Sequence, residues 1–182
     1  MEIVVPDEFK YLYVQNAERP VVKIPDPVLR KVCQPVPKLD KKVNEFIDEM
    51  IAALKKANGV GIAAPQMGKA LRLIIIAPHG MKPTALLNPV LSGHEGEIIG
   101  EEGCLSIPGF RENVARAATV VVEGKDLEGN DVRLEAQELM SRAFQHEIDH
   151  LDGILFLQHL SPLKRDLIKR KIKKLIKAGE WE

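Results

Sequence analysis

The sequence contains no hydrophobic run long enough to cross a bilayer. Its longest purely apolar stretch, residues 73–77, is far shorter than the ~20 residues that a membrane-spanning helix needs. The first twenty residues also lack the basic start and apolar segment of a secretory signal. Two cysteines, Cys33 and Cys104, are too few for a disulfide-stapled scaffold. These absences predict a cytoplasmic protein with reduced thiols and no membrane partner.

Internal repeats and low-complexity tracts are absent as well, which excludes solenoid and array architectures. The chain has 182 residues, of which 45% are hydrophobic and 29% are charged. These values are typical of a globular protein and too apolar for a disordered one. We therefore expect a single domain over residues 1–182.

Charge is balanced overall but not along the chain. The 26 basic and 26 acidic residues cancel, yet residues 161–182 hold 8 basic and 3 acidic side chains, a net +5 against −5 elsewhere. An N-cap Ser161, a proline after it and apolar residues along one side predict an amphipathic helix over residues 161–178. Its basic face offers a contact to ribosomal RNA, or is simply solvated. We expect no DNA partner.

Hydrophobic spacing predicts the other elements. Apolar residues three and four apart indicate a helix over residues 39–57, and strand-like composition marks residues 71–77, 84–91 and 117–123. The turn at residues 126–131 predicts that residues 132–136 return as an antiparallel hairpin. Residues 137–152 have helical periodicity and end before a glycine. This order favours an α+β fold in which antiparallel sheets pack around a central helix.

The central helix carries an HExxH sequence. His146 and His150 project from one helix face and can share a metal ion, while Glu147 lies at the edge of that face, where a general base is needed. Two core histidines and an exposed glutamate are the alternative. If the metal reading holds, the identity of the third ligand decides the kind of site.

Upstream, Cys104 is a candidate for a third ligand; the alternative, usual for a free cysteine, is a small buried apolar side chain. The downstream histidine of the metzincin pattern is replaced by Phe156, and the acidic residues further on lie in or beside the basic tail. Cys104 follows a glycine within a predicted turn at residues 101–106. A thiolate and two imidazoles leave a fourth position open, as in catalytic sites. Cys33 has no such neighbours and is expected to be a buried apolar side chain.

A third motif, GVGIAAPQ, spans residues 59–66. Its small residues, Gly61 among them, allow another backbone to approach closely. Gln66 offers a neutral amide that can stabilise an oxyanion. The alternative is a turn with a surface glutamine.

Taken in order, GVGIAAPQ, EGCLS and QHEIDH resemble the three signature motifs of peptide deformylase. The resemblance runs from about residue 21 to residue 164 and leaves residues 1–20 as an N-terminal extension. It implies a hydrolase that removes the N-formyl group from the initiating N-formylmethionine of nascent polypeptides and releases formate. It also implies Cys104, His146 and His150 as ligands of one divalent metal ion, usually Fe²⁺, with Zn²⁺, Ni²⁺ or Co²⁺ able to substitute.

The resemblance further implies roles around the metal. Glu147 handles the proton of the attacking water, and Gln66 with the backbone N–H of Leu105 stabilises the oxyanion. The substrate backbone lies along Gly61 as an added strand. The implied methionine pocket consists of Val60, Leu139, Ala143 and the stem of Arg142.

Two other readings remain open at this stage. One is a short HExxH metallopeptidase, which Cys104 disfavours. The other is a non-catalytic ribosome-associated module, whose structural metal needs a fourth protein ligand, for which the remaining histidines, His79, His94 and His159, are candidates. Glu102 and Asp149 are expected to support the site, although Asp149 is equally compatible with a solvated surface position.

Overall fold

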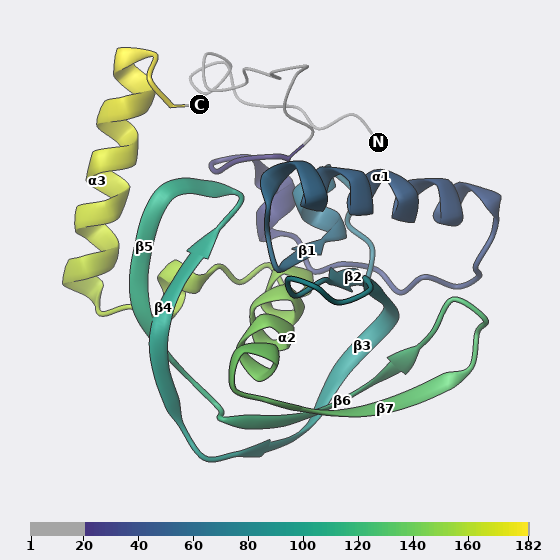
Figure 1. The fold of residues 1–182 in the computed structure, drawn as a ribbon. Coiled ribbons are helices and arrows are strands. Elements are labelled where there is room, and N and C mark those ends of the chain that lie inside the picture. Colours follow the sequence, from purple (N-terminus) through teal and green to yellow (C-terminus); the bar gives the residue numbers. More distant parts are fainter. Residues whose placement is uncertain (1–20, 182) are drawn as a thin grey trace.

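A computed structural model describes residues 21–181, so the proposed extension at residues 1–20 lies outside the described part of the chain. Over these residues the fold is mixed α+β, with two antiparallel sheets and three α-helices. Figure 1 shows the central helix, α2 (Glu138–Leu151), lying between the larger sheet and the two-stranded ribbon. The expected fold class is therefore confirmed at this level.

The larger sheet has five strands in the order β1-β2-β3-β6-β7. These are β1 (Gly61–Ala63), β2 (Leu73–Ile76), β3 (Thr84–Glu95), β6 (Thr119–Lys125) and β7 (Asp131–Gln137). All neighbouring strands are antiparallel. The predicted hairpin is confirmed, since Val120 pairs with Ala136 and Val122 with Leu134. Asp126 closes its turn by accepting hydrogen bonds from the backbone of Glu128 and Asn130.

The smaller sheet was not predicted. It consists of β4 (Ile98–Cys104) and β5 (Ile107–Arg116). The predicted turn at residues 101–106 was wrong for residues 101–104, which belong to β4. Only Leu105 and Ser106 connect the paired Cys104 and Ile107. The glycines and glutamates of β4 have weak strand propensity, and its pairing with β5 overrides that preference.

Helices α1 (Lys41–Ala57) and α3 (Pro162–Ala178) have side-chain caps at their starts. Asp40 accepts a hydrogen bond from the backbone of Val43, which explains why α1 begins two residues later than its apolar pattern suggested. Ser161 caps α3 in the same way. Short 3-10 helices complete the fold: η2 (Pro27–Arg30), η3 (Ala64–Met67) and η4 (Phe156–His159).

The packing of α2 positions the site. Its buried apolar face, with Phe144, Ile148 and Leu151, belongs to one core cluster with β2, β3 and β6.

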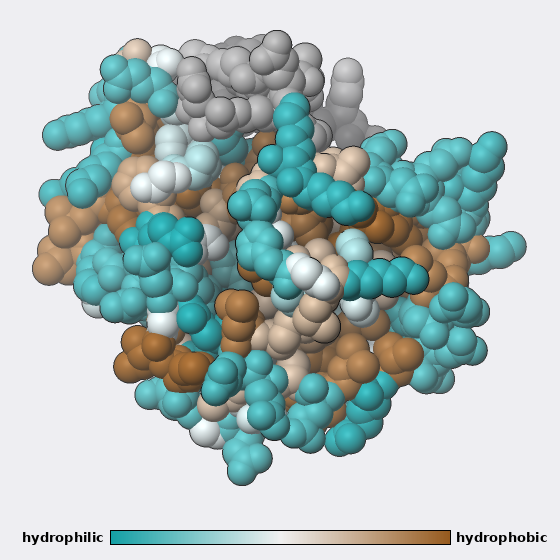
Figure 2. Space-filling model, in the orientation of Figure 1, coloured by the Kyte–Doolittle hydropathy of each residue, from teal (hydrophilic) through white to brown (hydrophobic). Residues whose placement is uncertain are grey.

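Figure 2 shows a molecular surface on which hydrophilic side chains surround smaller hydrophobic patches. Within residues 21–181, no helix combines the length and apolar character that crossing a membrane requires.

Candidate active site

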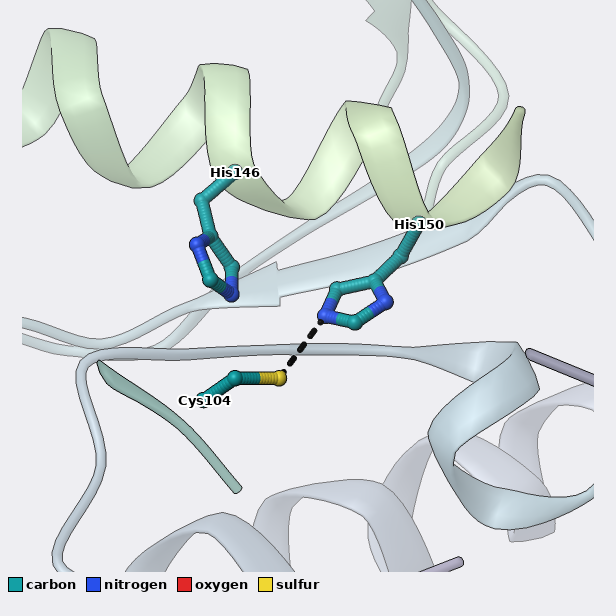
Figure 3. A group of neighbouring side chains, drawn as sticks. All are labelled: Cys104, His146 and His150. Carbon is teal, nitrogen blue, oxygen red and sulfur yellow. Dashed lines mark hydrogen bonds between the residues drawn. The ribbon is translucent and has the colours of Figure 1, made fainter. Parts of the chain in front are cut away.

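Three side chains that could hold a metal ion converge between α2 and the end of β4. Figure 3 shows His146 and His150 pointing from consecutive turns of α2 toward Cys104. The Sγ atom of Cys104 lies 3.2 Å from Nε2 of His150, and the three donor atoms lie within 4.8 Å of one another. Ligand atoms around a tetrahedral metal are separated by roughly 3.3–3.6 Å, given metal–ligand bonds of about 2.0–2.3 Å. The arrangement therefore fits a divalent ion with small side-chain adjustments.

His146 is oriented from behind by Glu102. Its Nδ1 lies 3.0 Å from Oε2 of Glu102, which leaves Nε2 available toward the cluster. Burial alone would raise the pKa of Glu102, but hydrogen bonds from His146 and Arg116 outweigh it and lower the pKa to about 2. A carboxylate behind a histidine is the usual support of a metal-ligating imidazole. Burial lowers the pKa of His150, which favours the neutral form that binds metals.

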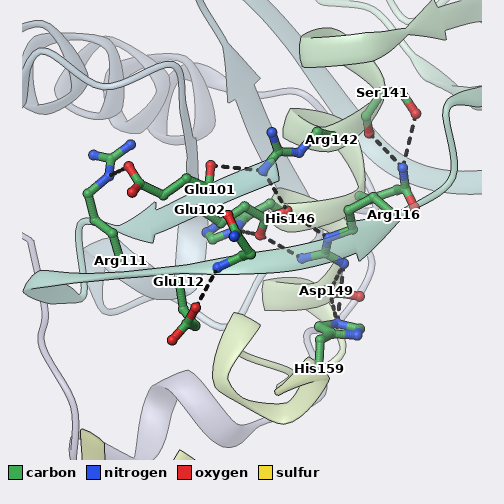
Figure 4. A network of polar contacts seen from close by, with 12 residues as sticks. Glu101, Glu102, Arg111, Glu112, Arg116, Ser141, Arg142, His146, Asp149 and His159 are labelled. Carbon is green, nitrogen blue, oxygen red and sulfur yellow. Dashed lines mark hydrogen bonds and ion pairs between the residues drawn. The ribbon is translucent and has the colours of Figure 1, made fainter. Parts of the chain in front are cut away.

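Arg116 joins two carboxylates behind the site, as Figure 4 shows. Its guanidinium donates to both oxygens of Glu102 at 2.9 and 3.0 Å and to Asp149 at 2.6 Å. Asp149 also pairs with His159 at 2.7 Å. The solvated alternative for Asp149 is therefore wrong. Sequence reasoning missed Arg116, because nothing in a single arginine fourteen residues from Glu102 indicates a buried pair.

Glu147 is buried next to Gly61. A β-carbon added to Gly61 would lie 2.7 Å from Oε1 of Glu147, so only glycine leaves room for this carboxylate. Burial raises the pKa of Glu147 to about 7. Its Oε2 is buried without a hydrogen-bond partner among residues 21–181. A buried carboxylate with a raised pKa and an unused oxygen is suited to exchanging protons with a small ligand.

Gln66 is almost fully buried, which overturns the alternative of a surface glutamine. Its Oε1 accepts a hydrogen bond from the backbone N–H of Ala63 at 2.9 Å. This contact orients the amide nitrogen, which lies 3.2 Å from Oγ of Ser106 and 3.6 Å from Sγ of Cys104. An amide donor is thereby fixed beside the three-ligand cluster.

A cleft of about 940 Å³ opens onto this cluster. Leu139 is more than half exposed, and Arg142 turns toward β4 to donate to the carbonyl of Glu101 at 2.8 Å. Phe110 also lines the cleft, although no sequence motif singled it out. Ten of the predicted site residues line the cleft: Val60, Gly61, Gln66, Cys104, Leu105, Leu139, Arg142, Ala143, His146 and Glu147.

In the described part of the chain, the potential ligand group contains three residues and no fourth. His159 is engaged with Asp149, and His94 lies near the end of β3. His79 lines the cleft but is not one of the three clustered ligands. This arrangement disfavours a closed structural metal site.

Comparison with known proteins agrees with the geometry. Residues 18–166 match the family model of polypeptide deformylases. A peptide deformylase of Acidobacterium capsulatum is 45% identical over 167 residues, covering 90% of this chain and 98% of the relative. The crystal structure of a peptide deformylase from Legionella pneumophila is 37% identical with a TM-score of 0.83, covering 89% of this chain and 97% of that one.

A further solved structure is that of a peptide deformylase from Synechococcus elongatus in complex with actinonin. It is 35% identical with a TM-score of 0.79, and the match covers 83% of this chain and 85% of that one. The family model covers most of the chain, and the sequence and structural relatives carry the same name. This chain belongs to the peptide deformylase family.

Proposed function

We propose that this chain acts as one catalytic domain that hydrolyses the N-formyl group from the initiating N-formylmethionine of nascent polypeptides and releases formate. The observation that carries the proposal is the convergence of Cys104, His146 and His150 at a cleft that also contains the buried Glu147. Two imidazoles and a thiolate leave a coordination position free for substrate or water.

Deformylases are metal-dependent, and we propose Cys104, His146 and His150 as the ligands here, with Fe²⁺ as the native ion. Zn²⁺, Ni²⁺ and Co²⁺ suit the same mixed sulfur and nitrogen donors, so availability in the cytoplasm selects among them. When bound, such an ion supplies a Lewis acid for the formyl carbonyl and lowers the pKa of water. Glu102 supports this ligand set, since it holds His146 with Nε2 toward the cluster.

Glu147 is the proposed proton carrier. Its carboxylate accepts a proton from the attacking water and delivers it to the amine nitrogen as the bond to the formyl carbon breaks. The raised pKa of about 7 matches a group that must gain and lose a proton in one cycle. The amide nitrogen of Gln66 and the backbone N–H of Leu105 are the proposed donors to the oxyanion.

The substrate is proposed to bind as an extra strand along β1. This strand lies at the edge of the five-stranded sheet, so one side of its backbone is open to another chain. Gly61 leaves space there beside Glu147. The methionine side chain is assigned to the wall formed by Val60, Leu139, Ala143 and the stem of Arg142.

Ribosome contact through α3 is a second part of the proposal. Seven basic side chains of this helix are exposed, namely Lys164, which pairs with Glu112, and Lys169, Arg170, Lys171, Lys173, Lys174 and Lys177. Such a surface attracts a phosphate backbone through its charge. It would hold the enzyme where formylated substrates emerge.

Formate release tests the function directly. Protein loaded anaerobically with Fe²⁺ is incubated with an N-formyl-Met peptide and, in parallel, with its N-acetyl counterpart. We expect formate from the first and no deacylation of the second. Cleavage of internal peptide bonds would instead support the HExxH peptidase, and a metal-loaded protein inactive on both peptides would overturn the proposal.

A further inference from the structure

After α3 ends, the single tryptophan of the chain lies against two segments whose residues line the proposed substrate cleft. Gly179 adopts a left-handed conformation (φ 71°), and Glu180 donates its backbone N–H to the carbonyl of Leu175 at 2.9 Å. This turn directs Trp181 back onto the protein. Its indole Nε1 donates to the carbonyl of Ile24 at 2.8 Å, and its ring centroid lies 6.1 Å from that of Phe110.

Trp181 thereby connects two separate walls of the cleft. One wall is the segment at residues 21–24, of which Val21 and Lys23 line the cleft. The other is the start of β5, where Phe110 lines it. The indole hydrogen bond fixes the first wall and the ring contact fixes the second.

The first wall is also hydrogen-bonded to Gln66, a proposed oxyanion donor, and to Ser106, which follows the other proposed donor, Leu105. Ile24 donates its N–H to the carbonyl of Ser106 at 3.0 Å, and Val22 donates to the carbonyl of Gln66 at 2.7 Å. The backbone of Ile24 is thus held through its N–H by the β4–β5 turn and through its carbonyl by Trp181. We therefore expect replacement of Trp181 to displace this cleft wall more than the metal ligands.

Phe110 lines the cleft at a distance from the ligand cluster that an extended peptide can reach beyond its methionine. Ile107 pairs with Cys104, and Phe110 follows three residues later on β5. Three strand residues span roughly 10 Å. An extended substrate anchored at the metal cluster by its formyl group reaches that far with the residues after methionine.

We infer that Trp181 is a positioning residue that holds the cleft walls for the substrate residues following formylmethionine. The inference rests on the proposed function and extends it from the reacting group to the peptide chain. Trp181 touches neither the ligands nor the reacting atoms; it acts through Ile24 and Phe110.

The rest of α3 is attached independently of Trp181, so its replacement leaves the helix in place. Ile168 and Ile172 are buried in the apolar cluster that also contains Ile107. At the start of the helix, Lys164 pairs with Glu112 of β5 at 2.9 Å. Figure 1 shows α3 running beside β5.

Steady-state kinetics on two substrates test the inference. For Trp181→Ala we expect KM for a formyl-Met-Ala-Ala-Ser peptide to rise roughly three- to tenfold, because an aromatic contact that supports the cleft wall is lost. We expect kcat to stay within about twofold. Formyl-Met amide, which ends before this wall, is expected to keep its KM. Trp181→Phe retains a ring beside Phe110 but loses the hydrogen bond to Ile24, so it should recover only part of the loss. An equal change for both substrates, or no change for the longer one, would overturn the inference.

Fluorescence gives a readout that does not need turnover, because Trp181 is the only tryptophan. Titration of the metal-loaded protein with the product Met-Ala-Ala-Ser should change its emission with saturation, whereas Met amide should not. Phe110→Leu should reduce the change. An emission unaffected by the saturating tetrapeptide would contradict the inference. Absence of formate release by the wild-type enzyme would instead refute the proposed function, so the two failures are distinguishable.

Discussion

Gly61 and Glu147 occupy adjoining space, so that a single β-carbon on Gly61 would meet the glutamate carboxylate at 2.7 Å. The two residues come from different parts of the chain, the edge strand β1 and the central helix α2. The contact explains why a glycine is required where the proposed substrate strand pairs. It also makes Gly61 a position at which the carboxylate can be displaced without altering the proposed metal ligands.

Gly61→Ala should lower kcat/KM at least tenfold, because the buried Glu147 must move off its position and catalytic geometry tolerates displacements of only about 0.5 Å. Metal content should stay at the wild-type level, as measured by atomic absorption. Wild-type kinetics in this variant would show that the position of Glu147 is not critical.

Glu147→Ala should retain metal and lose turnover by about 10²- to 10⁴-fold, the usual contribution of a general base. The isosteric Glu147→Gln variant should lose a similar factor, since it preserves volume and removes the titrating group. Metal loss that accompanies the fall in activity would contradict the assigned role, because Glu147 would then support the ligands.

Cys104→Ser should abolish the thermal stabilisation that metal addition gives the wild type. Ligand binding to the folded state stabilises it by about 2.7 kcal/mol at a free concentration one hundred times the Kd. Melting curves with and without Co²⁺ measure this shift. Cys33→Ser is the matched control: Cys33 is also buried, its pKa is raised by burial to about 11, and it is not part of the metal-binding group. Equal metal-induced shifts in both variants would refute Cys104 as a ligand.

Arg116→Met should weaken metal binding by about 10- to 100-fold, because Glu102 loses the partner that fixes it behind His146. It should also destabilise the fold by about 3–5 kcal/mol, the usual cost of removing one partner of a buried ion pair. Arg116→Met combined with Glu102→Gln should regain stability without regaining metal affinity. Competition with a coloured chelator measures affinity, and denaturant titration measures stability. An unchanged metal affinity in the single variant would show that this ion-pair network does not support metal binding.

Replacing Lys169, Lys173 and Lys174 by glutamine should weaken ribosome binding and reduce its dependence on salt, since each phosphate contact adds about one to the logarithmic salt slope. Co-sedimentation with ribosomes at several salt concentrations measures both quantities. These side chains are exposed, so activity on free peptides should not change. Unchanged ribosome binding in the variant would show that the basic face of α3 is solvated and does not contact the ribosome.

Elements with strong local patterns could be predicted from the sequence. The apolar spacing of α1 and the hairpin of β6 and β7 were found within about two residues of their observed ends. The ribbon of β4 and β5 was missed because its glycines and glutamates have low strand propensity. The short β1 was also missed, since three residues are too few for a periodic signal.

The sequence by itself determined the chemical types of the site: two histidines one helical turn apart, a glutamate beside them, and an upstream cysteine and glutamine. Helical spacing alone puts His146 and His150 on one face, which is a local property of the backbone. Only the tertiary structure decided the contacts between distant segments. Arg116 behind Glu102, Gly61 against Glu147 and Trp181 across two cleft walls all depend on how sheets and helices pack. Such contacts follow from long-range packing, which no periodicity within one segment encodes.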